Sequence, residues 1–134
     1  MQSFERQMSD IIKDRERKAN MLFVGLVLRL FNRIIRRTPV DTGRAKSNWN
    51  FASGSIDETT TEEKDKTGGP TIARAVAGSK SVKLGDTVYI SNSLDYIRAL
   101  EYGNPPKSPK APQGMVRVTV AEIGQALREA SRNG

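Results

Sequence analysis

The 134-residue sequence contains no cysteine and no histidine. Without cysteine there are no disulfides and no thiol nucleophiles. Without histidine the chain lacks the commonest metal ligand and the side chain best suited to proton transfer near neutral pH. The serines consequently have no histidine partner for nucleophilic catalysis. We expect a protein that is not an enzyme, uses no metal ion and no cofactor, and is held together by packing alone.

Long hydrophobic stretches are also missing. The longest apolar run extends from Met21 to Leu28, far short of the ~20 residues that cross a bilayer. Residues 1–18 mix acidic and basic side chains instead of placing an apolar stretch behind a basic start, which argues against a secretory signal. We therefore expect no membrane association and a protein that acts where it is made.

The length of the chain fits one domain, residues 1–134, with a modest core. Any large assembly must then be built from several copies. The net charge of +7 is unevenly distributed: residues 1–46 carry 11 basic and 5 acidic side chains, residues 47–70 carry 2 and 5, and residues 71–134 carry 9 and 5. A basic helix without interleaved aromatic residues is more typical of a solvated or subunit-facing surface than of a nucleic-acid site.

The segment from Ser3 to about Arg37 has no proline and only one glycine, which predicts one long helix over residues 3–37. Its apolar residues recur at helical spacing and form one broad face. That face contains Phe4, Met8, Ile11, Ile12, Ala19, Leu22, Phe23, Leu26, Val27, Leu30 and Ile34.

The second half of this helix has an additional apolar stripe beside the first, and a helix that is apolar over most of its circumference must be covered on most sides. The cover can come from a sheet plus a second helix, or from a neighbouring subunit. We single out the stripe as a candidate oligomer-facing surface; it consists of Met21, Val24, Leu28, Phe31 and Ile35.

Shorter elements follow the long helix, and together they predict an α+β fold. In that fold the long N-terminal helix packs on a small, mainly antiparallel sheet, with a short middle helix and a C-terminal helix. Pro39 and Gly43 end the first helix in a turn, and Trp49 and Phe51 point to the core from the first strand. The expected elements are strands over 47–52 and 86–91, a helix over 71–79, a helical turn over 97–101, and a final helix over about 114–131, whose first turns a strand could replace.

Two connections differ from the rest in composition. Residues 53–70 are polar and acidic and predict a mobile loop or extended arm. Its acidic residues lack the glycine and the ligand spacing of a calcium loop, so we expect solvated side chains from Asp57, Glu58, Glu62, Glu63 and Asp65. Residues 104–112 contain four prolines and predict a semi-rigid exposed connection. Both are candidate docking arms.

Three motifs occur in an order that resembles the tail completion, or head–tail joining, proteins of tailed phages, including the lambda-type minor tail protein Z group. The similarity spans about residues 20–125. The motifs are Thr38-Pro-Val-Asp-Thr-Gly-Arg44 with Trp49, then Val88-Tyr-Ile-Ser-Asn92 with Tyr96, and finally Leu100-Glu-Tyr-Gly103 followed by Ala111-Pro-Gln-Gly-Met-Val-Arg117.

The resemblance implies a structural subunit of the virion neck, made in the host cytoplasm and assembled as a homo-oligomeric ring, with a hexamer as the expectation. Its implied partners are further copies of itself, the tail terminator or tail tube protein, and the head connector or adaptor protein, with non-specific DNA contact in the lumen. A tail terminator that caps the tail tube is one alternative. A basic DNA-binding accessory protein is an alternative of another class.

Transferred residue by residue, the resemblance marks a set of signature and candidate interface residues. Asp41, Gly43 and Arg44 would shape the turn after the long helix, and Trp49 would anchor the first strand. We expect Arg44 to pair with Glu101 or Asp41, because these are opposite charges within the signature. The full set is Asp41, Gly43, Arg44, Trp49, Tyr96, Glu101, Tyr102, Gly103, Gln113 and Gly114.

Overall fold

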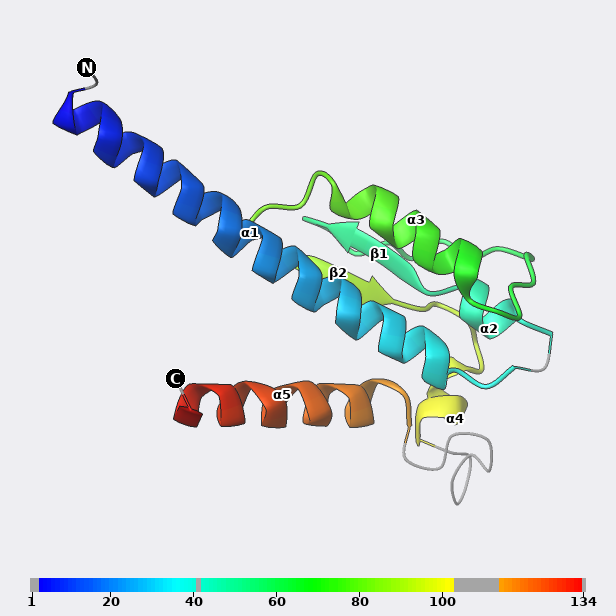
Figure 1. The fold of residues 1–134 in the computed structure, drawn as a ribbon. Helices are drawn as coiled ribbons and strands as arrows, with labels where there is room; N and C mark the ends of the chain where they lie inside the picture. The colour runs from blue at the N-terminus through cyan, green and yellow to red at the C-terminus, as the bar shows by residue number, and fades with distance from the viewer. Residues whose placement is uncertain (1–2, 41, 103–113, 134) are drawn as a thin grey trace.

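A computed structural model describes residues 3–40, 42–102 and 114–133 (Figure 1). It confirms the α+β fold, with a long N-terminal helix, a small antiparallel sheet, a middle helix and a C-terminal helix. The elements in order are α1 (Phe4–Arg37), α2 (Arg44–Ser47), β1 (Asn50–Ser53), α3 (Gly69–Ser79), β2 (Val88–Ser91), α4 (Ile97–Tyr102) and α5 (Val116–Asn133).

Helix α1 begins one residue after the predicted start and ends at Arg37, as its sequence predicts. The Ser3 hydroxyl accepts a 3.2 Å hydrogen bond from the backbone N–H of Arg6 and caps the first turn. The helix ends at Arg37 because Thr38 precedes Pro39 and takes an extended conformation, with φ −71° and ψ 123°. With 34 residues, α1 is about 51 Å long.

The sheet consists of two antiparallel strands, in which Phe51 pairs with Ile90 and Ala52 with Tyr89. The predicted first strand over 47–52 begins too early, because residues 44–47 form the short helix α2. The Ser47 hydroxyl and the Asn48 amide both donate to the carbonyl oxygen of Arg44, at 3.0 and 2.8 Å. These local bonds give the backbone a helical turn in place of sheet pairing.

The core forms where the second half of α1 meets the other elements. Figure 1 shows α3 and the sheet on one side of α1 and α5 on the other. The first turns of α5 are helical, and the strand alternative is wrong. The buried cluster consists of Phe31, Ile34, Ile35, Trp49, Ala75 and Met115.

This core corrects the assignment of the second apolar stripe of α1. Phe31 and Ile35 are fully buried within the domain, and Leu28 packs against the same cluster. Val24 is half-buried, which leaves Met21 as the exposed member, with 66% of its surface accessible. The sheet and the helices of the same chain therefore cover most of the stripe that we singled out as oligomer-facing.

The acidic connection lies against the domain instead of extending from it as an arm. Asn48 and Thr61 exchange two hydrogen bonds, of 2.9 and 2.8 Å, between the Asn48 side chain and the Thr61 backbone. Farther along, the Asn50 amide donates to the carbonyl oxygens of Asp57 and Thr59. The proline-rich connection 104–112 falls outside the described residues.

Candidate functional site

The signature residues gather in three places around the C-terminal end of α1. The first joins the turn to the first strand. The Trp49 indole N–H donates a 2.8 Å hydrogen bond to the Thr38 hydroxyl, which itself donates to the carbonyl oxygen of Ile34. Trp49 and Thr38 are both buried. Trp49, directly before β1, is therefore bonded to the residue that ends α1.

The second place is a groove beside the turn, with a volume of about 490 Å³. It brings the adjacent signature residues Gly43 and Arg44 together with Tyr96, which is far from them in the sequence. Gly43 has φ 92°, and a Cβ atom there would lie 2.6 Å from the Asp65 backbone, so only glycine fits. The groove is lined by Pro39, Thr42, Gly43, Arg44, Ala45, Lys64, Tyr96 and Leu100.

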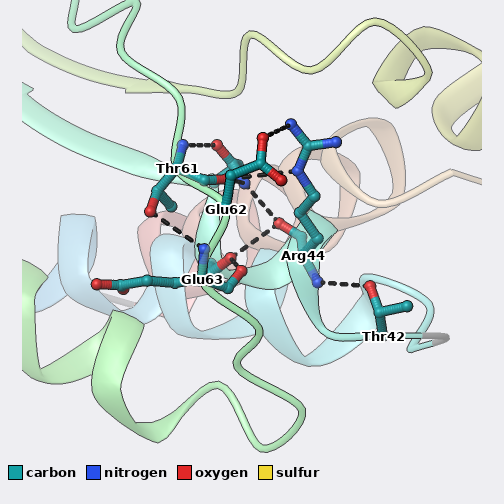
Figure 2. A network of polar contacts seen from close by, with 7 residues as sticks. Thr42, Arg44, Thr61, Glu62 and Glu63 are labelled. Atoms are coloured by element: carbon teal, nitrogen blue, oxygen red, sulfur yellow. Dashed lines mark hydrogen bonds and ion pairs between the residues drawn. The ribbon is translucent and has the colours of Figure 1, made fainter.

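Arg44 in this groove does not pair with Glu101. Its guanidinium forms a 3.0 Å ion pair with Glu62 and donates to the carbonyl oxygen of Thr61, as Figure 2 shows. The expectation of an Arg44–Glu101 pair is wrong because Glu101 is used elsewhere. The alternative partner, Asp41, lies outside the described residues.

The third place is the start of α5, where the Glu101 carboxylate accepts hydrogen bonds from three successive backbone N–H groups. They belong to Met115, Val116 and Arg117, at 2.5, 2.9 and 2.9 Å. These N–H groups have no partners within the helix, and a carboxylate at a helix N-terminus is favourable. Glu101 therefore fixes the beginning of α5 to the end of α4.

Two more signature residues lie beside this carboxylate. A Cβ atom on Gly114, whose φ is 84°, would lie 2.9 Å from Cδ of Glu101. The Arg117 guanidinium lies 4.6 Å from the centre of the Tyr102 ring, in a cation–π contact. Gly103 and Gln113 fall outside the described residues.

Asp65 has a role that its place in an acidic segment did not indicate, because its carboxylate is buried and caps α3. It accepts hydrogen bonds from the Gly68 N–H at 2.8 Å and from the Thr71 N–H at 2.9 Å. Burial alone would raise the pKa of Asp65, but the bonds from Thr71, Gly68 and Thr67 outweigh it, so its pKa lies below the ordinary value. The signal in the sequence was Pro70, which marks the helix start.

Lys46 was also missed. Its ammonium group is buried and donates a 2.8 Å hydrogen bond to the carbonyl oxygen of Ile35, near the end of α1. Burial lowers the pKa of Lys46, nearby Asp65 acts in the opposite direction, and Arg36 lowers it further. Lys46 thus links α2 to α1, and Asp65 links the acidic connection to α3.

An exposed apolar surface lies on the N-terminal part of α1, which projects beyond the other elements in Figure 1. Between Ser3 and Lys18 every residue is exposed except Asp14, which is half-buried. Phe4 is 72% and Leu22 is 76% accessible. We name this surface the free face of α1; it comprises Phe4, Met8, Ile11, Ile12 and Leu22.

Helix α5 has a second such surface. Its first turns pack against the domain through Thr119 and Ile123, and Glu122 forms ion pairs with Arg33 and Arg37 of α1. The hydrogen bond from Arg37 is the main reason that the pKa of Glu122 lies below its ordinary value, and burial acts in the opposite direction. Residues 125–132 are all exposed. We name the free stripe of α5 by its members Val120, Ala126, Leu127 and Ala130.

The described residues contain no group of three or more acidic side chains placed to hold a metal ion. None of the helices in ranges 3–40, 42–102 and 114–133 is long and apolar enough to span a membrane. Comparison with known proteins found no match to a family model, to a curated protein or to a solved structure. The likeness to tail completion proteins therefore rests on the three sequence motifs.

Proposed function

We propose that this protein is a structural subunit of a phage virion neck, which completes the tail and joins it to the head connector as a homo-oligomeric ring. The observation that carries the proposal is the free face of α1, an exposed apolar surface on the part of the helix that projects beyond the other helices and the sheet. Exposed apolar surface of this extent is characteristic of protein interaction sites.

The signature residues support this proposal in a second way. Most of those that the structure describes have internal duties: Trp49 and Glu101 each hold two elements together, and Gly43 and Gly114 allow close backbone approach. Residues with such internal contacts stabilise the fold. Function then depends on the surfaces that the scaffold presents, namely the groove beside Arg44 and Tyr96 and the projecting helix half.

The decisive experiment removes the coding sequence from the parent phage and examines the products by electron microscopy. We expect filled heads and tails of normal length that remain separate. Purified protein added to the mixed extract should restore joined, infectious particles. Mass spectrometry of purified virions should detect the protein. Joined particles that form without it, or virions that lack it, would contradict the neck assignment.

The same experiment separates the two alternatives. A tail terminator stops polymerisation of the tail tube, so its loss gives tails of irregular, excessive length. A DNA-binding accessory protein leaves particle morphology normal and gives a salt-dependent mobility shift with duplex DNA. Residues 4–20 contain five basic and four acidic side chains. This near balance of charge favours contact with protein over contact with phosphate.

A further inference from the structure

The free face of α1 continues a face that is already used for helix packing. Positions eleven residues apart return to nearly the same side of an α-helix, so Ile11, Leu22 and Arg33 lie along one line. At Arg33 this line is covered by α5, through the 2.9 Å ion pair to Glu122. At Ile11 and Leu22 no described element covers it. The line that α5 covers at Arg33 is therefore open toward the N-terminus of α1.

The α5 helix of the same chain does not reach this surface. Beyond Glu122, residues 123–133 extend α5 by about 16 Å. The distance along α1 from Arg33 back to Ile12 is about 31 Å. Even an α5 aligned parallel to the α1 axis would end before Ile12. Among the described helices, α5 thus leaves the part of the free face between Phe4 and Ile12 open to another molecule.

The chain itself offers a matching surface in the free stripe of α5. Val120 and Leu127 are 56% and 54% accessible and are seven residues apart, so they lie on one side of the helix. Ala126 and Ala130 widen this stripe with small side chains, against which large ones such as Phe4 and Met8 can pack. Figure 1 shows both projecting helix halves on the same side of the domain.

Charges beside the two surfaces select an orientation. By helical position, Glu5 lies on one side of the free face of α1, and Arg128 lies toward the corresponding side of the free stripe of α5. Antiparallel helices bring equivalent sides together. With Phe4 and Met8 against Ala130 and Ala126, Arg128 is then level with Glu5 on the same side of the pair. A parallel pair at the same place would bring Glu129 to the side of Glu5 instead.

We infer that the free face of α1 of one copy binds the free stripe of α5 of the next copy as an antiparallel helix pair. This inference rests on the proposed ring and names its interface. Each copy gives α1 to one neighbour and α5 to the other, so the contact is head-to-tail. Such contacts generate closed rings when the rotation between neighbours closes.

Two double variants test the inference by native mass spectrometry and sedimentation across a range of concentrations. Met8→Lys with Ile12→Lys disables α1, and Val120→Lys with Leu127→Lys disables α5. All four side chains are exposed, so circular dichroism should show an intact fold. The wild type should form multi-copy assemblies, and each double variant alone should be monomeric. Asp10→Lys, at an exposed position on the opposite side of α1, is the control and should assemble normally.

Mixing the two double variants gives the sharpest result. A head-to-tail contact leaves one intact α1 and one intact α5 between them, so we expect a one-to-one heterodimer and nothing larger. If two α1 helices pair with each other instead, the α5 variant alone still dimerises and mixing produces no heterodimer. That result, or a wild type that stays monomeric, overturns the inference.

Orientation has its own test. Arg128→Glu should weaken association roughly two- to fivefold, and adding Glu5→Arg should restore it. An unrescued pair overturns the antiparallel arrangement. The outcomes are separable from the fate of the neck proposal: a heterodimer from a protein absent from virions refutes the neck function alone. If the protein is found in virions but the mixed double variants form no heterodimer, this interface alone is refuted.

Discussion

The Trp49 indole nitrogen and the Thr38 hydroxyl oxygen are 2.8 Å apart in a buried hydrogen bond that joins the first strand to the end of the longest helix. The Thr38 hydroxyl is at the same time the donor of a 2.7 Å bond to the carbonyl oxygen of Ile34. One hydroxyl group therefore satisfies an indole N–H and a helix carbonyl in the interior. Both residues belong to the first sequence motif, and their hydrogen bond explains why a threonine and a tryptophan occur together in it.

Replacing Thr38 with valine should destabilise the protein by about 1–3 kcal/mol, because the buried Trp49 N–H loses its partner without gaining water. Urea unfolding followed by Trp49 fluorescence measures the change. The matched control is Thr42→Val, at an exposed position whose hydroxyl accepts a 3.3 Å bond from the backbone N–H of Arg44. We expect that control to change stability by less than about 0.5 kcal/mol. Equal effects at the two positions would contradict the role of the buried bond.

Alanine substitution at two glycines should have opposite effects. Gly114→Ala should cost about 1–2 kcal/mol or more, since φ is 84° and the new Cβ would meet the Glu101 side chain. Gly25→Ala should stabilise by about 0.5–1 kcal/mol, because Gly25 is inside α1 and the added methyl group would meet no atom within 4 Å. Thermal unfolding of both variants checks the pair. A neutral Gly114→Ala would show that the Glu101 contact with α5 is not tight.

The sequence predicted the elements well because their signals are local. Helical spacing and the absence of proline define α1, and Pro39 and Pro70 mark a helix end and a helix start. Alternation in the 47–52 segment pointed to a strand, but the Ser47 and Asn48 side chains favour the α2 turn instead. A pattern of polar and apolar residues does not show that side-chain hydrogen bonds to the local backbone compete with the hydrogen bonds between strands.

The candidate site was harder to predict because it depends on which surfaces the fold leaves open. The sequence showed that α1 has too much apolar surface for a solvated helix, but it could not show which half stays uncovered. The sheet, α3 and α5 all pack on the second half, so Phe31 and Ile35 are buried while Phe4 and Leu22 are exposed. The partner of Glu101 was equally hidden, since backbone N–H groups carry no sequence signal.

Asp65→Ala should destabilise the protein by about 1–2 kcal/mol near pH 7, because the first turn of α3 loses its carboxylate cap. Since the pKa of Asp65 is lower in the folded state, its stabilisation is complete above the unfolded pKa of about 3.9. It is lost as the pH falls through the folded value. The difference between wild type and variant should therefore narrow below about pH 4. Chemical denaturation at several pH values measures it.

Two further variants make this result specific. Asp65→Asn keeps an acceptor oxygen without the charge, so we expect an intermediate loss of stability that is insensitive to acid pH. Glu58→Ala, at an exposed position of the same connection, should leave stability within about 0.5 kcal/mol. A large effect of Glu58→Ala would mean that the overall acidity of the segment, not the cap, stabilises α3.

Hydrogen exchange along α1 should reveal the difference between its two halves. In the monomeric Met8→Lys, Ile12→Lys variant, amides between residues 4 and 18 should exchange far faster than those of Phe31, Ile34 and Ile35. Helical segments of this length without tertiary packing are only marginally stable in water, whereas the core amides open only with the domain. In assembled wild-type protein the first half should become protected, together with residues 124–132 of α5. Protection of the first half without protection of α5 would mean that a different surface covers α1, and uniform protection in the monomer would mean that its exposed half needs no partner.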